Sequence, residues 1–215
     1  MHRALVDERH RLRQQAIQRT TATRLELALR GMTDLSEEEL HAYVEVAHPT
    51  VAGGQMVAAD TAASYTGVLA GPRTTGRRRP ADVAKALLRA GVLIQPDSRA
   101  LVAPVLRARR LVAEGQETAP ALQAAASYAG SLASNDIQAA MRVGLEEGAA
   151  AAELDVNGWT KDLSSSSCDW CQQIAQGSYG TPDAVPYHDN ERCGVTPDLD
   201  DGPDRYVYDD SDIPF

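Results

Sequence analysis

The sequence is poor in aromatic residues, and this shortage argues against a β-sandwich. Of its 215 residues only 5% are aromatic, with two tryptophans and one phenylalanine, whereas 43% are hydrophobic. The hydrophobic residues are mostly Ala, Leu and Val, which suit a core of packed helices with small side chains. We therefore expect a mainly α-helical protein with an elongated helical body.

Long apolar runs are absent too. No stretch approaches the roughly 18 consecutive apolar residues that a transmembrane helix needs, and the first fifteen residues lack the apolar segment of a secretory signal. We expect neither a membrane span nor secretion by a signal of the chain's own.

Positive charge is scarce in the C-terminal part of the chain. Residues 1–31 contain seven arginines and three acidic residues, residues 32–152 have a net charge of −2, and residues 153–215 contain three basic and fourteen acidic residues. The two ends therefore carry about +4 and −11 of the total charge of −9. Such a separation suggests different partners for the two ends, or two solvated surfaces.

Helical patterns fill the N-terminal body. Apolar spacing predicts one helix over residues 3–30, which Gly31 should end. Ser36 and Glu39 form a capping-box pattern that starts a short second helix, and Pro49 should close it. The further segments that we expect to be helical are 50–69 with a weak point at Gly53–Gly54, 81–90, a helix from Asp97 or Ser98 to about 112, and 118–152 as one helix or two joined near Ser134–Asn135.

Cysteine is scarce, but its few copies are clustered. Cys168, Cys171 and Cys193 lie within 26 residues near the C-terminus. In a reducing cytoplasm such a cluster favours metal binding or thiol reactivity over disulfides. After Trp159 the chain is rich in Ser, Gly, Pro and Asp, so this segment buries little apolar surface and needs a cross-link to be ordered.

The spacing of the cysteines and of one histidine matches a structural zinc site. A C-x2-C pair is followed, after sixteen residues, by an H-x4-C pair, and two such pairs can converge on one tetrahedral Zn²⁺. Three thiolates and one imidazole close the coordination sphere, so the sequence predicts a structural ion and no catalytic residue. The predicted ligands are Cys168, Cys171, His188 and Cys193.

Other readings of this cluster remain open. A C-x-x-C pair can be a redox motif, although no βαβ pattern surrounds this one. Cys168 or Cys193 could be a nucleophile with His188 as its base, which needs a cleft and an orienting group. The three thiols could also be unrelated and buried without a metal.

The chain resembles the MuF-like minor head proteins of tailed bacteriophages, especially those of phages of actinobacteria. That family has a long helical body, a strand with a tryptophan, and a C-terminal knuckle of the form CxxC, a glycine turn and H-x2-C-x-C. The resemblance covers roughly residues 116–196. Glu191 stands where the family often has a further cysteine, which leaves open whether Glu191 replaces a ligand. The matching stretches are 157–159, 168–171, 177–180 and 188–193.

The resemblance implies a minor capsid protein that is made in the host cytoplasm and resides in the virion, at the portal and head interior, and takes part in head assembly. Its implied partners are the phage portal protein, the major capsid protein or scaffold, and packaged DNA. Related reading frames are often labelled capsid maturation proteases, so a protease or another Cys/His enzyme is an alternative. A serine protease needs a Ser-His-Asp or Ser-Lys set, whereas Ser164–Ser167 resembles a loop.

The last residues resemble the acidic tip of bacterial single-stranded-DNA-binding proteins. In that family the terminal Phe enters an apolar pocket while its carboxylate and nearby acids meet basic residues. The same chemistry would make this chain an adaptor for a host DNA-processing protein, although an acidic tail can also simply be solvated. The residues that would bind are Asp210, Asp212, Ile213, Pro214 and Phe215.

Residues 70–80 are rich in Gly, Pro and Arg and should form an exposed loop. Its arginines could neutralise DNA phosphates without reading sequence, or could simply be solvated. These arginines are Arg73, Arg77, Arg78 and Arg79. The sequence thus predicts three parts: a helical body over 1–156, a zinc-knuckle module over 157–197, and an acidic tail over 198–215. We expect Trp159 and Trp170 to pack the module against the last helix of the body.

Overall fold

The computed structural model confirms a mainly helical protein with a small two-stranded sheet near the C-terminus. It describes residues 3–71, 80–96, 98–165, 167–188 and 193–199. The helices are α1 (Arg3–Arg30), α2 (Glu37–Ala70), α3 (Pro80–Arg89), α4 (Arg99–Ala113), α5 (Thr118–Ala151) and α6 (Asp169–Ile174). A 3₁₀ turn, η1, spans Pro182–Ala184, and the strands are β1 (Gly158–Asp162) and β2 (Gly194–Asp198).

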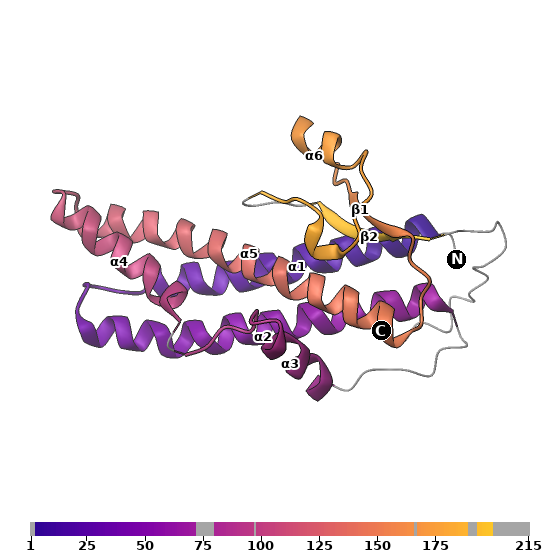
Figure 1. Ribbon diagram of the computed structural model, residues 1–215. Coiled ribbons are helices and arrows are strands. Elements are labelled where there is room, and N and C mark those ends of the chain that lie inside the picture. Colours follow the sequence, from indigo (N-terminus) through magenta and orange to yellow (C-terminus); the bar gives the residue numbers. More distant parts are fainter. Residues whose placement is uncertain (1–2, 72–79, 97, 166, 189–192, 200–215) are drawn as a thin grey trace.

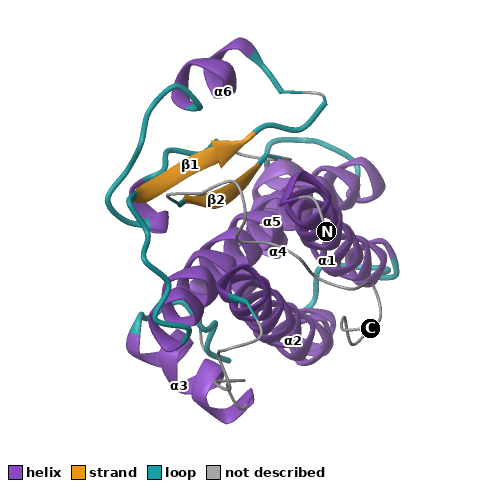
Figure 2. Cartoon of the chain, turned by 90° about the vertical axis from the view of Figure 1, so that its right-hand side faces the viewer, coloured by secondary structure: helices purple, strands orange, loops and turns teal. Residues whose placement is uncertain are grey.

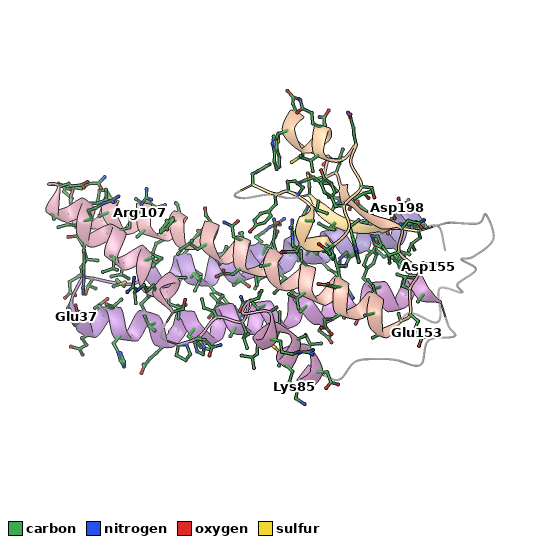
Figure 3. All side chains as sticks on the ribbon, in the orientation of Figure 1. Glu37, Lys85, Arg107, Glu153, Asp155 and Asp198 are labelled. Carbon is green, nitrogen blue, oxygen red and sulfur yellow. The ribbon has the colours of Figure 1, made fainter. Side chains whose placement is uncertain are left out.

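Three long helices form the body. Figure 1 shows α1, α2 and α5 running along a common axis, with α4 beside α5 at one end of the bundle and the strands over its other half. Figure 3 marks the two ends by their side chains, with Glu37 near one end and Asp155 and Asp198 near the other. None of the helices described is both long and apolar enough to cross a membrane.

Helix α5 is the centre of the bundle because nearly its whole circumference is covered. Its side chains take part in three hydrophobic clusters, one with α1, α2 and α4, one with α2 and the strands, and one with α2 and α3. The helix is unbroken through Ser134–Asn135, so the segment forms one helix rather than two. It begins at Thr118, with Glu117 at the N-cap position.

The turn from α1 to α2 follows the local signals in the sequence. Helix α1 ends before Gly31, whose N–H donates to the Leu27 carbonyl at 3.0 Å. Ser36 is the N-cap of α2, and its Oγ accepts from the Glu39 N–H at 3.2 Å. The second half of the capping box is different, because the Glu39 carboxylate accepts from the backbone and hydroxyl of Thr33.

Helix α2 continues through Pro49, and the prediction that this proline ends a short helix is wrong. The ring removes the backbone donor that would otherwise bond to the Glu45 carbonyl, and the Thr50 hydroxyl adds a bond to the neighbouring Val46 carbonyl at 2.7 Å. Gly53–Gly54 does not interrupt the helix either. A Cβ on Gly54 would lie 2.5 Å from Thr21 Oγ1, so this glycine lets α2 approach α1 closely.

The small module packs on the body through a shared hydrophobic cluster. Strands β1 and β2 are antiparallel, with Trp159 opposite Pro197. Trp159 is buried and joins Met141 and Leu145 of α5 in one cluster, which confirms its predicted packing. The module therefore lies against α5 and α1, as Figure 2 shows at the top of the view along the bundle.

Candidate metal centre

Three of the predicted ligands meet in the module. The Sγ atoms of Cys168 and Cys171 lie 3.5 Å apart, and His188 Nε2 lies 3.4 Å from the first sulfur and 3.2 Å from the second. We call this group the Cys/His triangle. It is a set of potential metal ligands, and the cysteines are free thiols rather than a disulfide.

The triangle has nearly the dimensions of a zinc site. Zn–S bonds of about 2.3 Å and Zn–N bonds of about 2.0 Å at tetrahedral angles place two sulfurs about 3.8 Å apart and a sulfur and a nitrogen about 3.5 Å apart. The distances in the triangle differ from these values by about 0.3 Å or less. One ion could therefore be bound with very small side-chain shifts, and the soft thiolate and imidazole donors suit zinc.

Short local elements position the two thiols. Cys168 is the N-cap of α6 and is exposed, whereas Cys171 lies on the first turn of that helix and is buried. The Cys171 N–H and thiol, and then His188, lower the pKa of the Cys168 thiol to about 7. A larger share of thiolate at neutral pH favours metal binding, because the thiolate is the ligand.

Two buried cations fix the segment that presents His188. Lys161 of β1 donates from Nζ to the Pro186 carbonyl, and Arg142 of α5 donates to the Asp183 carbonyl at 3.1 Å. Both side chains are nearly inaccessible to solvent. The sequence did not predict either role, because each depends on a contact more than 20 residues away and no local pattern marks it.

Aromatic rings cover these cations. The Lys161 ammonium lies 4.9 Å from the centre of the Trp170 ring, and the Arg142 guanidinium lies 4.4 Å from the centre of the Tyr187 ring. Trp170 also meets His188 edge to face. Trp170 remains 40% exposed and is not part of the cluster that joins Trp159 to α5. The prediction that it packs the module against the last helix is therefore wrong, and it lies beside the triangle instead.

Cys193 lies outside the triangle. Its Sγ is 3.5 Å from the Ser164 backbone nitrogen and 3.7 Å from the Ser164 hydroxyl, and it is not among the grouped ligands. The structure thus brings together three of the four predicted ligands and places the fourth against the segment that joins β1 to α6.

Several predicted sites lie outside the described residues. Glu191 is one of them. The others are the loop arginines Arg73, Arg77, Arg78 and Arg79 and the tail residues Asp210, Asp212, Ile213, Pro214 and Phe215.

The fold and the triangle define a helical-bundle protein with a small Cys/His module. Comparison with known proteins does not narrow this class. No family model matches the chain, and no curated protein and no solved structure matches it significantly.

Proposed function

We propose that this protein is a minor structural protein of a tailed-phage virion, whose C-terminal module is stabilised by a zinc ion. The observation that supports this most is the Cys/His triangle, in a small module that follows a tryptophan-bearing strand and a long helical body. That order of elements is the one expected from the resemblance to MuF-like minor head proteins. The portal and the head interior are the proposed location, and the portal protein is the proposed partner.

In this proposal the zinc ion is structural, and Cys193 supplies the fourth ligand. Its thiol lies in the same module, beside Ser164, and a movement of that side chain to the triangle would complete a Cys3His set. Such a set leaves no position for a reacting water. The ion would then link α6, the His188 segment and the start of β2, which between them bury little apolar surface of their own.

The metal assignment is tested by elemental analysis of the purified full-length chain. We expect about one zinc per chain, and loss of most of it in Cys171→Ser and His188→Ala. His41→Ala, which removes an exposed histidine on α2, should retain the ion. Cys193→Ser should weaken zinc binding at least tenfold, because only three protein ligands remain. Less than about half an equivalent of zinc in the wild type would contradict the proposal.

The virion assignment is tested separately. Mass spectrometry of purified virions and of DNA-free heads should detect the chain at a copy number far below that of the major capsid protein, and the portal protein should co-purify with it. Absence from both particles would refute the structural role while leaving the zinc result intact. Proteolysis of a capsid protein that is lost in Cys171→Ser but retained in His41→Ala would favour the enzymatic alternative.

A further inference from the structure

Helix α1 has an unusual distribution of polar and apolar residues. Its inward face is polar over three turns, where His10, Gln14, Gln18 and Thr21 are all buried. Three of the five leucines of α1 lie on the outward face, where Leu5, Leu12 and Leu27 are each at least half exposed, whereas the other two, near the end of the helix, are buried. A helix that only had to cover the core would place its leucines inward, so the outward face requires another explanation.

Five exposed residues of α1 lie in one row along the helix. Four apolar residues and one threonine, whose methyl group can also pack, recur at spacings of four or seven residues, which is the spacing of a helix-packing seam. Exposed arginines lie beside them. We call this surface the α1 row. Its members are Leu5, Leu12, Ala16, Thr23 and Leu27, and its arginines are Arg9, Arg19 and Arg30.

Helix α2 carries a second exposed row of the same kind. Its members follow one another at spacings of three or four residues, and acidic side chains border them. We call this surface the α2 row. Its apolar members are Ala42, Val46, Pro49, Gly53 and Val57, and its acidic members are Glu38, Glu45 and Asp60.

Two members of the α2 row are costly in an isolated helix. Pro49 removes a backbone donor, and glycine lowers helix stability relative to alanine. Unlike Gly54, whose Cβ would collide with Thr21, Gly53 faces open space, because a Cβ there would meet nothing within 4 Å. Packing within one copy therefore does not explain Gly53, whereas close approach of a helix from outside does.

The charges of the two rows are opposite. Helix α1 contains seven arginines and three acidic residues, while α2 contains five acidic residues and neither lysine nor arginine. Two α1 rows would repel each other, and so would two α2 rows, whereas an α1 row and an α2 row attract. Each copy of the chain thus carries both halves of a complementary surface.

We propose that the α1 row of one copy packs against the α2 row of a second copy. In Figure 2, α1 and α2 form the right-hand side of the bundle, whereas α3 lies at the lower left and the module at the top. The right-hand side of these two helices is therefore not covered by α3 or by the module. If the α1 row of each copy packs on the α2 row of the other across a two-fold axis, the assembly is a closed dimer. If each copy instead contacts two different neighbours, the assembly is a ring or an open chain. The inference depends on neither the zinc nor the virion assignment.

The test is the mass of the full-length chain by light scattering and sedimentation, as a function of concentration and salt. We expect species heavier than the 23.0 kDa monomer at low salt, and dissociation at high salt because the rows attract through charge. A wild-type chain that stays monomeric up to millimolar concentration would overturn the proposal.

Charge reversal identifies the surfaces. Arg9→Glu with Arg19→Glu makes both rows acidic, and Glu45→Lys with Asp60→Lys makes the α2 row basic like its partner. Each pair alone should weaken self-association at least tenfold, the two variants mixed should form a heteromer, and the four changes in one chain should restore self-association. Arg99→Glu with Arg110→Glu on α4 is the matched control and should associate like the wild type.

Gly53→Gln separates association from folding. The side chain enters open space and favours the helix, so the thermal midpoint of the dilute monomer should be unchanged or higher, while self-association should weaken at least tenfold. Leu106→Gln, which removes an exposed leucine of α4, should leave association unchanged. Unaltered association in Gly53→Gln and in the charge-reversed variants would assign any oligomer to another surface and refute this one.

Discussion

At the residue scale, His10 shows how far burial can shift a titration. Its ring stacks on Tyr65 with centroids 4.0 Å apart, and it shares a hydrogen bond with Gln14. The other ring nitrogen, Nδ1, is buried without a hydrogen-bond partner. Burial, and to a lesser degree Arg13, lowers the pKa of His10 to about 3. The imidazole is therefore neutral in the folded protein at neutral and mildly acidic pH.

This shift predicts sensitivity to acid. A group whose pKa is depressed on folding stabilises the protein above its unfolded pKa of about 6.5, and that stability is lost as the pH falls toward 3. Between pH 7 and pH 4 the loss from His10 should be about 3 kcal/mol. His10→Gln should remove this part of the loss when the free energy of unfolding is measured with urea at both pH values.

Two features make that measurement specific. Burial raises the pKa of Asp162 to about 6 in spite of the nearby Arg11. Asp162 therefore makes the protein more stable as the pH falls over the same range, which opposes the effect of His10. The difference between variant and wild type isolates the contribution of His10. His41→Gln, at an exposed histidine, should behave like the wild type. An equal loss in wild type and His10→Gln would refute the prediction.

The two tryptophans differ in how deeply they are buried. Trp159 is 5% exposed and packs on α5, whereas Trp170 is 40% exposed and lies on Lys161. Trp159→Ala should lower the free energy of unfolding by about 3 to 5 kcal/mol, as expected for a buried aromatic residue. Trp170→Ala should cost about 1 kcal/mol or less. Urea unfolding followed by circular dichroism would compare them, and equal costs would contradict the assigned burial.

The ligands themselves illustrate what the sequence can and cannot predict about a site. The C-x2-C spacing places two thiols within one helical turn, so their proximity follows from local geometry. His188 required a long-range guess, which the structure confirms. The position of Cys193 beside Ser164 depends on how β2 pairs with β1, and no local spacing encodes that.

At the element scale, local signals predicted the ends of helices better than their continuity. Gly31 ends α1 and Ser36 begins α2 because a single backbone or side-chain hydrogen bond decides each of these points. Pro49 did not end its helix, because residues on both sides of it, Ala47 and Val51, are buried in the same cluster. Tertiary packing thus outweighed the local cost of the proline.

The crossing of α2 and α5 depends on two glycines. A Cβ on Gly144 would lie 2.2 Å from the Ala59 carbonyl oxygen, and one on Gly148 would lie 2.5 Å from Ala63 Cα. Gly144→Ala should therefore lower the free energy of unfolding by about 1 to 3 kcal/mol, although alanine is the better helix former by about 1 kcal/mol. Thermal and urea unfolding of the variant would measure the difference.

The control for this crossing lies on the same helix as Ala59. A Cβ on Gly67 would meet nothing within 4 Å, so Gly67→Ala should keep the helix-forming benefit and raise the free energy of unfolding by up to about 1 kcal/mol. If Gly144→Ala stabilised the protein as Gly67→Ala does, the helices would cross at another point or at a greater distance.

At the scale of the whole molecule, the body and the module differ in what stabilises them. The helices bury continuous apolar clusters that involve no metal ligand, and β1 and β2 are attached to α5 through Trp159. By contrast α6 has six residues, of which only Cys171 is buried. The hydrophobic core thus continues from the helices into the two strands, whereas α6 has few buried contacts of its own to stabilise it.

This difference predicts the effect of removing the metal. Chelation of the zinc-loaded chain should leave most of the helical circular dichroism at 222 nm, because α1 to α5 supply nearly all of it. Hydrogen exchange should speed up in α6 and around His188, since those segments lose the ion that joins them. In β1 exchange should change much less, because Trp159 still anchors the strand to α5. Cooperative loss of all helices on chelation would instead mean that the ion stabilises the bundle itself, and His188→Ala would then unfold like the chelated wild type.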